Sequence, residues 1–178
     1  MMAARAALWT AIGIGAVFVL RGCGATPADA AAVIVSSGPV VIPQESARYR
    51  LALARAAANQ FGLDAPVARL AAQIQQESAW DPRAESPYAQ GLSQFTPATA
   101  RWLPSVCPEV GPPDAWDPQW SLRALTCYDA WLYSRMASAA DECARWAFTL
   151  SAYNGGETAL DRERARRCAR ARPEPLVR

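Results

Sequence analysis

The spacing of apolar residues along the chain predicts an almost entirely helical protein. Segments with helical period are bounded by Pro, Gly and Thr start and stop signals, and no segment of convincing length alternates with the period of a strand. Residues 105–118 are too rich in Pro and Gly for regular structure, and a loop of that length is typically functional or tied by a disulfide. The expected helices are residues 44–61, 65–80, 96–103, 118–137 and 142–152.

One charged residue interrupts the apolar face of the second expected helix. At about 100° per residue, Val67, Leu70 and Ile74 share one face of that helix. Glu77 lies about 20° from Leu70 on the same face, whereas Arg69 lies on another side. A carboxyl group in apolar surroundings without a cation has a raised pKa, which suits a general acid. The alternative is a side chain that reaches water or pairs with a distant arginine.

The composition indicates one globular domain with an appendage. The chain has 178 residues, of which 52% are hydrophobic and 19% charged. All 18 basic residues are arginine, and the formal net charge of +2 is too small to indicate a partner. Nucleic-acid binding is not expected, because the domain without its C-terminal tail is slightly acidic.

The absence of histidine narrows the possible chemistry. Neither a Ser-His-Asp nor a Cys-His nucleophile system can form, and the commonest zinc ligand is missing. The cysteines also contain no CxxC pair. Acid/base catalysis by carboxylates remains, and the sequence predicts no cofactor and no metal.

The first thirty residues are typical of an export signal. Arg5 precedes an apolar run at residues 6–20, which is shorter than the roughly 20 residues that span a bilayer. Three fates stay open: cleavage near residues 28–30, lipidation of Cys23, or an uncleaved membrane anchor. Arg21 is atypical for lipidation, so cleavage is favoured. We expect an exported protein that is periplasmic, tethered to the inner membrane facing the periplasm, or secreted.

Four cysteines follow this signal segment. In an oxidising compartment an even number predicts two disulfides, and three connectivities are open. Each bridge would stabilise the domain by about 3 kcal/mol. The alternative is four unpaired buried thiols. The cysteines are Cys107, Cys127, Cys143 and Cys168.

These features predict four parts of the chain. Residues 1–30 are the signal peptide or anchor, residues 31–43 a linker, residues 44–160 the domain, and residues 161–178 an Arg-rich tail. The tail carries seven arginines against three acidic residues. A solvated, frayed helix end explains it most simply, and contact with an anionic membrane or wall polymer is the alternative.

Three short stretches resemble the signatures of one enzyme family. They are "ES" at residues 77–78, "SPYAQGLSQFTPATA" at residues 86–100 and "AYNGG" at residues 152–156. In this order they look like the motifs of soluble lytic transglycosylases and goose-type lysozyme-like domains. The resemblance covers about residues 69–156. It implies a mainly α, lysozyme-like helical domain with a glycan-binding cleft, and peptidoglycan glycan strands as the partner.

The resemblance also implies site residues. Glu77 would be the single catalytic acid/base, and Ser78 would position it or line the cleft. Tyr153 would hydrogen-bond to Glu77 or orient it, and Gln94 and Asn154 would contact N-acetylmuramyl groups. Local structure offers an alternative for the last two, because a glutamine there can cap a helix and an asparagine before two glycines can end one.

Residues 86–93 contain a further site residue and two departures from the family pattern. Ser86 matches a cleft residue, although a serine before a proline also suits a turn. Ser93 stands where the family usually has methionine, which removes an apolar cleft contact. Tyr88 adds an aromatic residue, and it is with Trp116 the better candidate for stacking on a sugar.

The function implied by the resemblance is that of a peptidoglycan lytic transglycosylase. Glu77 would protonate the β-1,4 bond between N-acetylmuramic acid and N-acetylglucosamine, then deprotonate the muramyl C6 hydroxyl to leave a 1,6-anhydro-muramic acid end. A lysozyme-type muramidase, such as a phage endolysin, would more often hold a second carboxylate. A non-catalytic peptidoglycan-binding module would need no acid at this position. The other acidic residues considered, none with a motif behind it, are Asp81, Glu85, Asp114 and Asp117.

Overall fold

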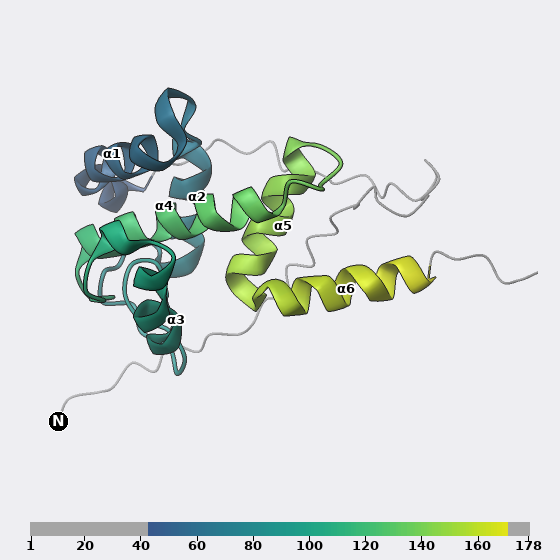
Figure 1. Ribbon diagram of the computed structural model, residues 1–178. Helices are drawn as coiled ribbons and strands as arrows, with labels where there is room; N and C mark the ends of the chain where they lie inside the picture. The colour runs from purple at the N-terminus through teal and green to yellow at the C-terminus, as the bar shows by residue number, and fades with distance from the viewer. Residues whose placement is uncertain (1–42, 171–178) are drawn as a thin grey trace, which may run out of the picture.

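The computed structural model describes residues 43–170, without the side chain of Cys168, and consists of helices joined by loops (Figure 1). The expected signal segment and residues 31–42 of the linker lie outside these residues. Within them the chain forms no strand, only isolated bridges between Glu85 and Gln90 and between Gln90 and Phe95. The helices are α1 (Arg50–Phe61), α2 (Val67–Ser78), α3 (Pro97–Trp102), α4 (Pro118–Arg135), α5 (Glu142–Gly155) and α6 (Glu157–Arg170), and the 3-10 helices are Gln44–Arg48, Gly62–Asp64, Leu103–Ser105 and Pro108–Val110.

This architecture confirms the predicted mainly α fold, and the helix boundaries follow local chemistry. Thr96 caps α3 by accepting a hydrogen bond from the backbone N–H of Thr99, with Pro97 in the first turn. Asp117 caps α4 in the same way. At its C-terminal end α5 runs three residues further than expected, because Asn154 and Gly155 stay helical and the left-handed Gly156 ends it.

The main hydrophobic core lies between α1, α2 and α4. The predicted apolar face of α2 is part of it, since Leu70 and Ile74 are fully buried, and the Pro- and Gly-rich segment before α4 contributes Cys107 and Val110. A smaller cluster joins the C-terminal half of α4 to α5 and α6. Its buried members are Leu132, Met136, Phe148, Ala152 and Leu160.

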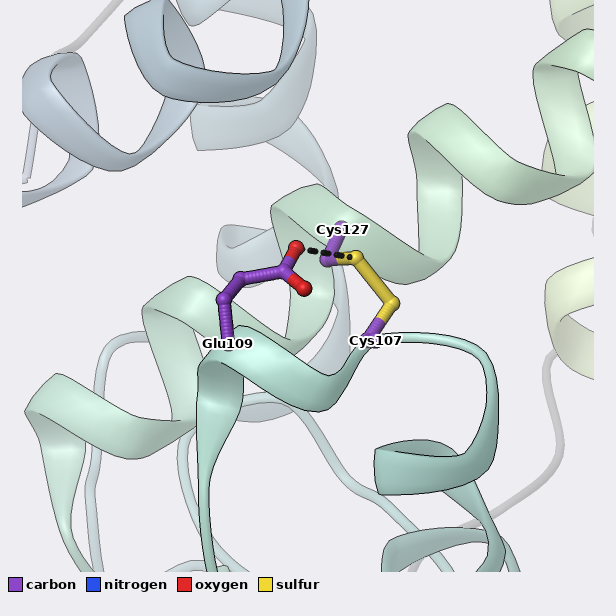
Figure 2. A group of neighbouring side chains, drawn as sticks. All are labelled: Cys107, Glu109 and Cys127. Atoms are coloured by element: carbon purple, nitrogen blue, oxygen red, sulfur yellow. Dashed lines mark hydrogen bonds between the residues drawn. A yellow bond between two sulfur atoms is a disulfide. The ribbon is translucent and has the colours of Figure 1, made fainter.

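A disulfide between Cys107 and Cys127 joins the Pro- and Gly-rich segment before α4 to that helix (Figure 2). Their Cα atoms are 6.2 Å apart, and a carboxylate oxygen of Glu109 lies 3.0 Å from the Cys127 sulfur. The expected disulfide is thus present for one pair. Cys143 is free and exposed at the start of α5, so the expected second bridge does not form through it.

Helix α6 is a largely solvated helix that points away from α1–α4 (Figure 1). Leu160 anchors it in the smaller cluster, and a salt bridge joins Glu157 to Arg135 of α4. It runs without interruption across the boundary expected at residue 160. None of the helices between residues 43 and 170 combines the length and apolar character that crossing a bilayer requires.

Candidate active site

A cavity of about 800 Å³ lies at the C-terminal end of α2. Its walls come from α2, from the loop between α2 and α3, and from α3, α4 and α5. The six site residues expected from the sequence all line it, although they are up to 77 positions apart in the chain. They are Glu77, Ser78, Ser86, Gln94, Tyr153 and Asn154.

Glu77 is held in the last turn of α2, facing this cavity. Burial raises the pKa of its carboxyl group from 4.5 to about 7. The last carbonyl groups of a helix carry partial negative charge. This charge disfavours a carboxylate there and therefore also acts to raise its pKa. The helix ends directly after it, because Ala79 and Trp80 take left-handed backbone conformations. Glu77 can therefore hold a proton near neutral pH at the edge of an open space.

Ser78 fixes the end of α2 to the loop that follows. Its buried hydroxyl donates a hydrogen bond of 2.7 Å to the carbonyl oxygen of Leu92, and the same hydroxyl lies 3.3 Å from the carbonyl oxygen of Ile74. Because Ser78 is the neighbour of Glu77, this tie sets where the carboxyl group stands relative to the loop. Positioning is thus the role that the contacts of Ser78 support.

The loop carrying Leu92 is also bound to α4 and α5. The hydroxyl of the fully buried Ser93 donates to the carbonyl oxygen of Ser121 in α4. Tyr153 of α5 in turn donates a 2.7 Å hydrogen bond to the backbone carbonyl oxygen of Ser93. The three stretches singled out by the sequence are therefore joined by hydrogen bonds from side chains of one to backbone carbonyls of another.

The Tyr153 hydroxyl donates to the loop rather than to Glu77, and the expectation that Tyr153 orients Glu77 stays a prediction. The single hydroxyl proton of Tyr153 is given to Ser93, so toward other groups its oxygen can only accept. Tyr153 still lies near Glu77: burial raises the pKa of the phenol well above 10, and the charge of Glu77 raises it further. Ser93, which departs from the family pattern, is not among the residues that line the cavity.

Gln94 and Gly91 give the loop its shape. Both amide hydrogens of Gln94 are directed at backbone carbonyls, those of Ala84 and Gly91, and this leaves its side-chain oxygen as an acceptor. Gly91 has a positive φ of 76°, and a Cβ atom there would overlap the carbonyl oxygen of Ala115. Only glycine allows this close approach between the loop and the segment before α4.

Ser86 and Asn154 line the cavity but make local contacts. The hydroxyl of Ser86 accepts hydrogen bonds from the backbone N–H groups of Tyr88 and Ala89, which is a serine turn. The amide of the exposed Asn154 donates to the carbonyl oxygen of Leu150, one turn earlier in α5. The Asn154 contact leaves its side-chain oxygen free as an acceptor for a ligand, whereas the Ser86 hydroxyl also donates to the carbonyl oxygen of Ala89 and is fully used within its own turn.

Four of the residues that line the cavity are aromatic. Tyr88 is 78% exposed and lines the cavity, as expected for a sugar-stacking candidate. Trp116, the other candidate, is 42% exposed but is not among the lining residues. The sequence did not single out Phe95 and Tyr128, whose rings contact each other and Tyr153.

Two carboxylates considered from the sequence, Asp81 and Glu85, also line the cavity. Asp81 accepts a hydrogen bond from the backbone N–H of Arg83, so one of its oxygens holds the turn after α2. The other two carboxylates lie elsewhere: Asp114 and Asp117 both accept hydrogen bonds from backbone N–H groups before and at the start of α4. Only the first pair can approach a ligand beside Glu77.

The fold and the cavity define a mainly α, lysozyme-like helical domain with a protonatable glutamate at the edge of its cavity. The chain belongs to the transglycosylase SLT domain family, whose sequence model matches residues 52–174. Members of this family are enzymes of the lytic transglycosylase type that act on peptidoglycan, a substrate that implies export. A search among curated proteins gave no match.

Proposed function

We propose that the protein is a peptidoglycan lytic transglycosylase that cleaves the β-1,4 bond between N-acetylmuramic acid and N-acetylglucosamine. The observation that carries this is the position of Glu77: a carboxyl group with a pKa of about 7, raised by burial, in a cavity lined by polar acceptors and aromatic rings. A group with this pKa is partly protonated at neutral pH and can act as acid and then as base.

The reaction needs one carboxyl group used twice. Protonated Glu77 gives its proton to the glycosidic oxygen as the bond to muramyl C1 breaks, which releases the 4-hydroxyl of N-acetylglucosamine. The Glu77 carboxylate then takes the proton of the muramyl C6 hydroxyl as that oxygen bonds to C1. The product is a 1,6-anhydro-muramic acid end, and the carboxyl group regains its proton without consuming water.

The surrounding residues have positioning roles in this proposal. Ser78 holds the end of α2 against the loop, and Tyr153 holds the same loop from α5. Gln94 and Asn154 each offer a side-chain oxygen as an acceptor for N–H or O–H groups of the sugars. The exposed ring of Tyr88 offers a face on which a pyranose ring can stack.

A muramidase that hydrolyses the same bond is the second candidate, because Asp81 and Glu85 lie in the same cavity. One of them would activate water on the face of the sugar opposite Glu77. The transglycosylase is preferred because Asp81 is engaged in its own turn and Glu85 lies in the loop that bridges to Gln90. A non-catalytic binding module would not require the protonated acid at position 77.

Product analysis tests the proposal. Purified peptidoglycan is digested with the protein and with its Glu77→Gln variant, and the released muropeptides are analysed by mass spectrometry. We expect 1,6-anhydro-muramic acid ends from the wild type and none from the variant. Reducing ends that disappear in Asp81→Asn or Glu85→Gln would instead establish the hydrolase. No release from a substrate that a control muramidase digests would overturn both.

A further inference from the structure

Beneath the cavity, α2 and α4 are bridged by two buried polar side chains outside the lining residues. Gln73 of α2 is 7% exposed and Asp129 of α4 is 0% exposed. Gln73 Nε2 donates to Asp129 Oδ1 over 3.5 Å, a long hydrogen bond. Gln73 is one helical turn before Glu77 on the same face of α2, so this bridge lies directly below the proposed acid.

The two remaining polar atoms of the bridge have no partner. Gln73 Oε1 and Asp129 Oδ2 are both buried and both unsatisfied among the described residues. If Asp129 were ionised, both atoms would be acceptors without a donor, and a buried charge would rest on one weak hydrogen bond. That arrangement is costly, because a buried carboxylate requires a cation or several donors.

Among residues 43–170, the groups that act on Asp129 supply no compensating positive charge. Glu77 acts on it from α2 as a like charge, while Tyr128 and Tyr153 approach it with phenol groups from α4 and α5. The buried positions of α1, which packs against α4, are apolar. Burial raises the pKa of Asp129 well above its ordinary value, and the hydrogen bond from Gln73 only partly opposes this.

A single proton on Asp129 Oδ2 resolves both unsatisfied atoms at once. As a carboxylic acid, Asp129 can donate Oδ2–H to Gln73 Oε1 while Gln73 Nε2 donates back to Oδ1. The acid and the amide then form a reciprocal pair with two hydrogen bonds and no net charge. Neither side chain has any other hydrogen-bond partner among residues 43–170.

We infer that Asp129 is held as a neutral carboxylic acid in a reciprocal pair with Gln73, and that this pair positions Glu77 in the cavity without a second negative charge beneath it. The effect on catalysis rests on the function proposed above, whereas the protonation of Asp129 does not. Asp129 is therefore a positioning residue: it lines no part of the cavity and cannot touch a substrate.

Infrared spectroscopy tests the protonation state independently of activity. The measurement uses the Glu77→Gln protein, so that the proton of Glu77 does not contribute, and compares it with the Glu77→Gln/Asp129→Asn double variant. We expect a carbonyl stretch of a protonated carboxylic acid at neutral pH in the first and its loss in the second. A carboxylate band in its place would overturn the inference whether or not the protein is a transglycosylase.

Thermal unfolding tests the reciprocal pair. Asparagine at position 129 keeps both hydrogen bonds with an uncharged group, so Asp129→Asn should leave Tm nearly unchanged. Gln73→Leu or Asp129→Leu alone leaves a buried polar partner unsatisfied and should lower Tm by several degrees. In the Gln73→Leu/Asp129→Leu double variant no polar group remains, and the loss should be smaller than the sum of the two. Additive losses would overturn the pairing.

The pH profile of cleavage tests the effect on Glu77. If Asp129 is neutral, Asp129→Asn keeps the midpoint of the basic limb where the wild type has it. If Asp129 is ionised, removing its charge lowers the pKa of Glu77 and moves the midpoint to lower pH, which would overturn the inference. Gln73→Leu, in contrast, should lower kcat with less effect on KM, because it displaces α2 beneath Glu77 rather than the sugar contacts.

Discussion

Glu77 in α2 and Glu163 in α6 carry the same side chain on helices of similar length, in opposite surroundings. Burial raises the pKa of Glu77 to about 7. The pKa of Glu163 is lowered, chiefly by a 2.7 Å hydrogen bond from Arg167. One carboxyl group is thus kept ready to carry a proton, and the other is kept ionised on the surface.

The difference shows how the chain uses its many charged residues. On α6 the acidic residues pair with arginines at the surface, where Glu163 pairs with Arg166 as well as Arg167. At the cavity Glu77 has no such pairing. Arg83 lines the wall, but its charge is not a cause of the shift in the pKa of Glu77. Exclusion of compensating charge, rather than residue type, makes Glu77 suited to acid/base chemistry.

The largest difference is expected in activity. Glu77→Gln removes the transferable proton while keeping the shape, so cleavage of peptidoglycan should fall by a factor of about 10³ or more. Glu163→Gln should leave the rate unchanged, because α6 contributes nothing to the cavity. The measurement is the initial rate of soluble muropeptide release. A Glu77→Gln variant that kept a tenth of the rate would contradict the role of Glu77 as the proton donor.

The two glutamates should also give opposite pH dependence of stability. The native state binds the Glu77 proton more tightly than the unfolded chain, so the free energy of unfolding falls as pH rises from 4.5 to about 7. Glu77→Gln removes this loss and should be more stable than wild type by about 3 kcal/mol at about pH 8, with no difference at about pH 4.

Glu163→Gln is the matched control for this prediction. Its lowered pKa gives stability that is present above the pKa of the unfolded chain and is lost as pH falls. The variant should therefore be slightly less stable than wild type near neutral pH and equal to it in acid, with a small effect because the ion pair is exposed. Chemical denaturation at several pH values measures both. The same sign for the two variants would contradict the assignment of their surroundings.

The described cysteines also differ, because one pair forms a disulfide and Cys143 is free. The Cys107–Cys127 disulfide closes a loop with a sequence separation of 20, so replacing both cysteines by serine should cost about 3 kcal/mol of unfolding free energy. Cys143 is free and exposed at the start of α5, and Cys143→Ser should change stability little. Denaturant unfolding without reductant checks both. An equal loss in the two variants would show that Cys143 has a structural partner.

Periodicity and capping signals were enough to predict much of the fold and to place Glu77 on the apolar face of its helix, whereas its proposed role came from the resemblance of the motifs. Leu70 and Ile74 defined the face on which Glu77 lies, and Thr96 with Pro97 marked the start of α3. The same spacing was present in α4, where Asp129 follows Leu125 by four positions and precedes the equally buried Leu132 by three. The signal for a second buried acid was therefore in the sequence.

Other features could not be predicted because they depend on tertiary contacts. Ala79 and Trp80 have left-handed backbone conformations, which a sequence normally indicates by glycine, and neither residue is glycine. The pairing of Cys107 with Cys127 follows only once the segment before α4 is folded back on that helix. Likewise, the donation of Tyr153 to Ser93 joins positions that are 60 residues apart. Local sequence patterns can indicate single residues, but tertiary packing determines which partners they contact.

The smallest predicted effect concerns the tie between α2 and the loop. Ser78→Ala leaves the buried carbonyl oxygen of Leu92 without its 2.7 Å hydrogen bond, which should cost about 1–2 kcal/mol. The matched control is Ser151→Ala, an exposed position on α5 that should change stability by less than about 0.5 kcal/mol. Because Ser78 adjoins Glu77, the first variant should also lower kcat several-fold, whereas the second should not.

Thermal unfolding and cleavage rates, measured on both serine variants, separate positioning from mere stability. A fall in kcat for Ser78→Ala at a temperature well below its Tm means that the carboxyl group has moved relative to the loop, since the folded fraction is then unchanged. An unchanged kcat with a lowered Tm would mean that the neighbouring contacts of α2 suffice to place Glu77. In that case the reciprocal pair of Gln73 and Asp129, one turn earlier, becomes the main support of the acid.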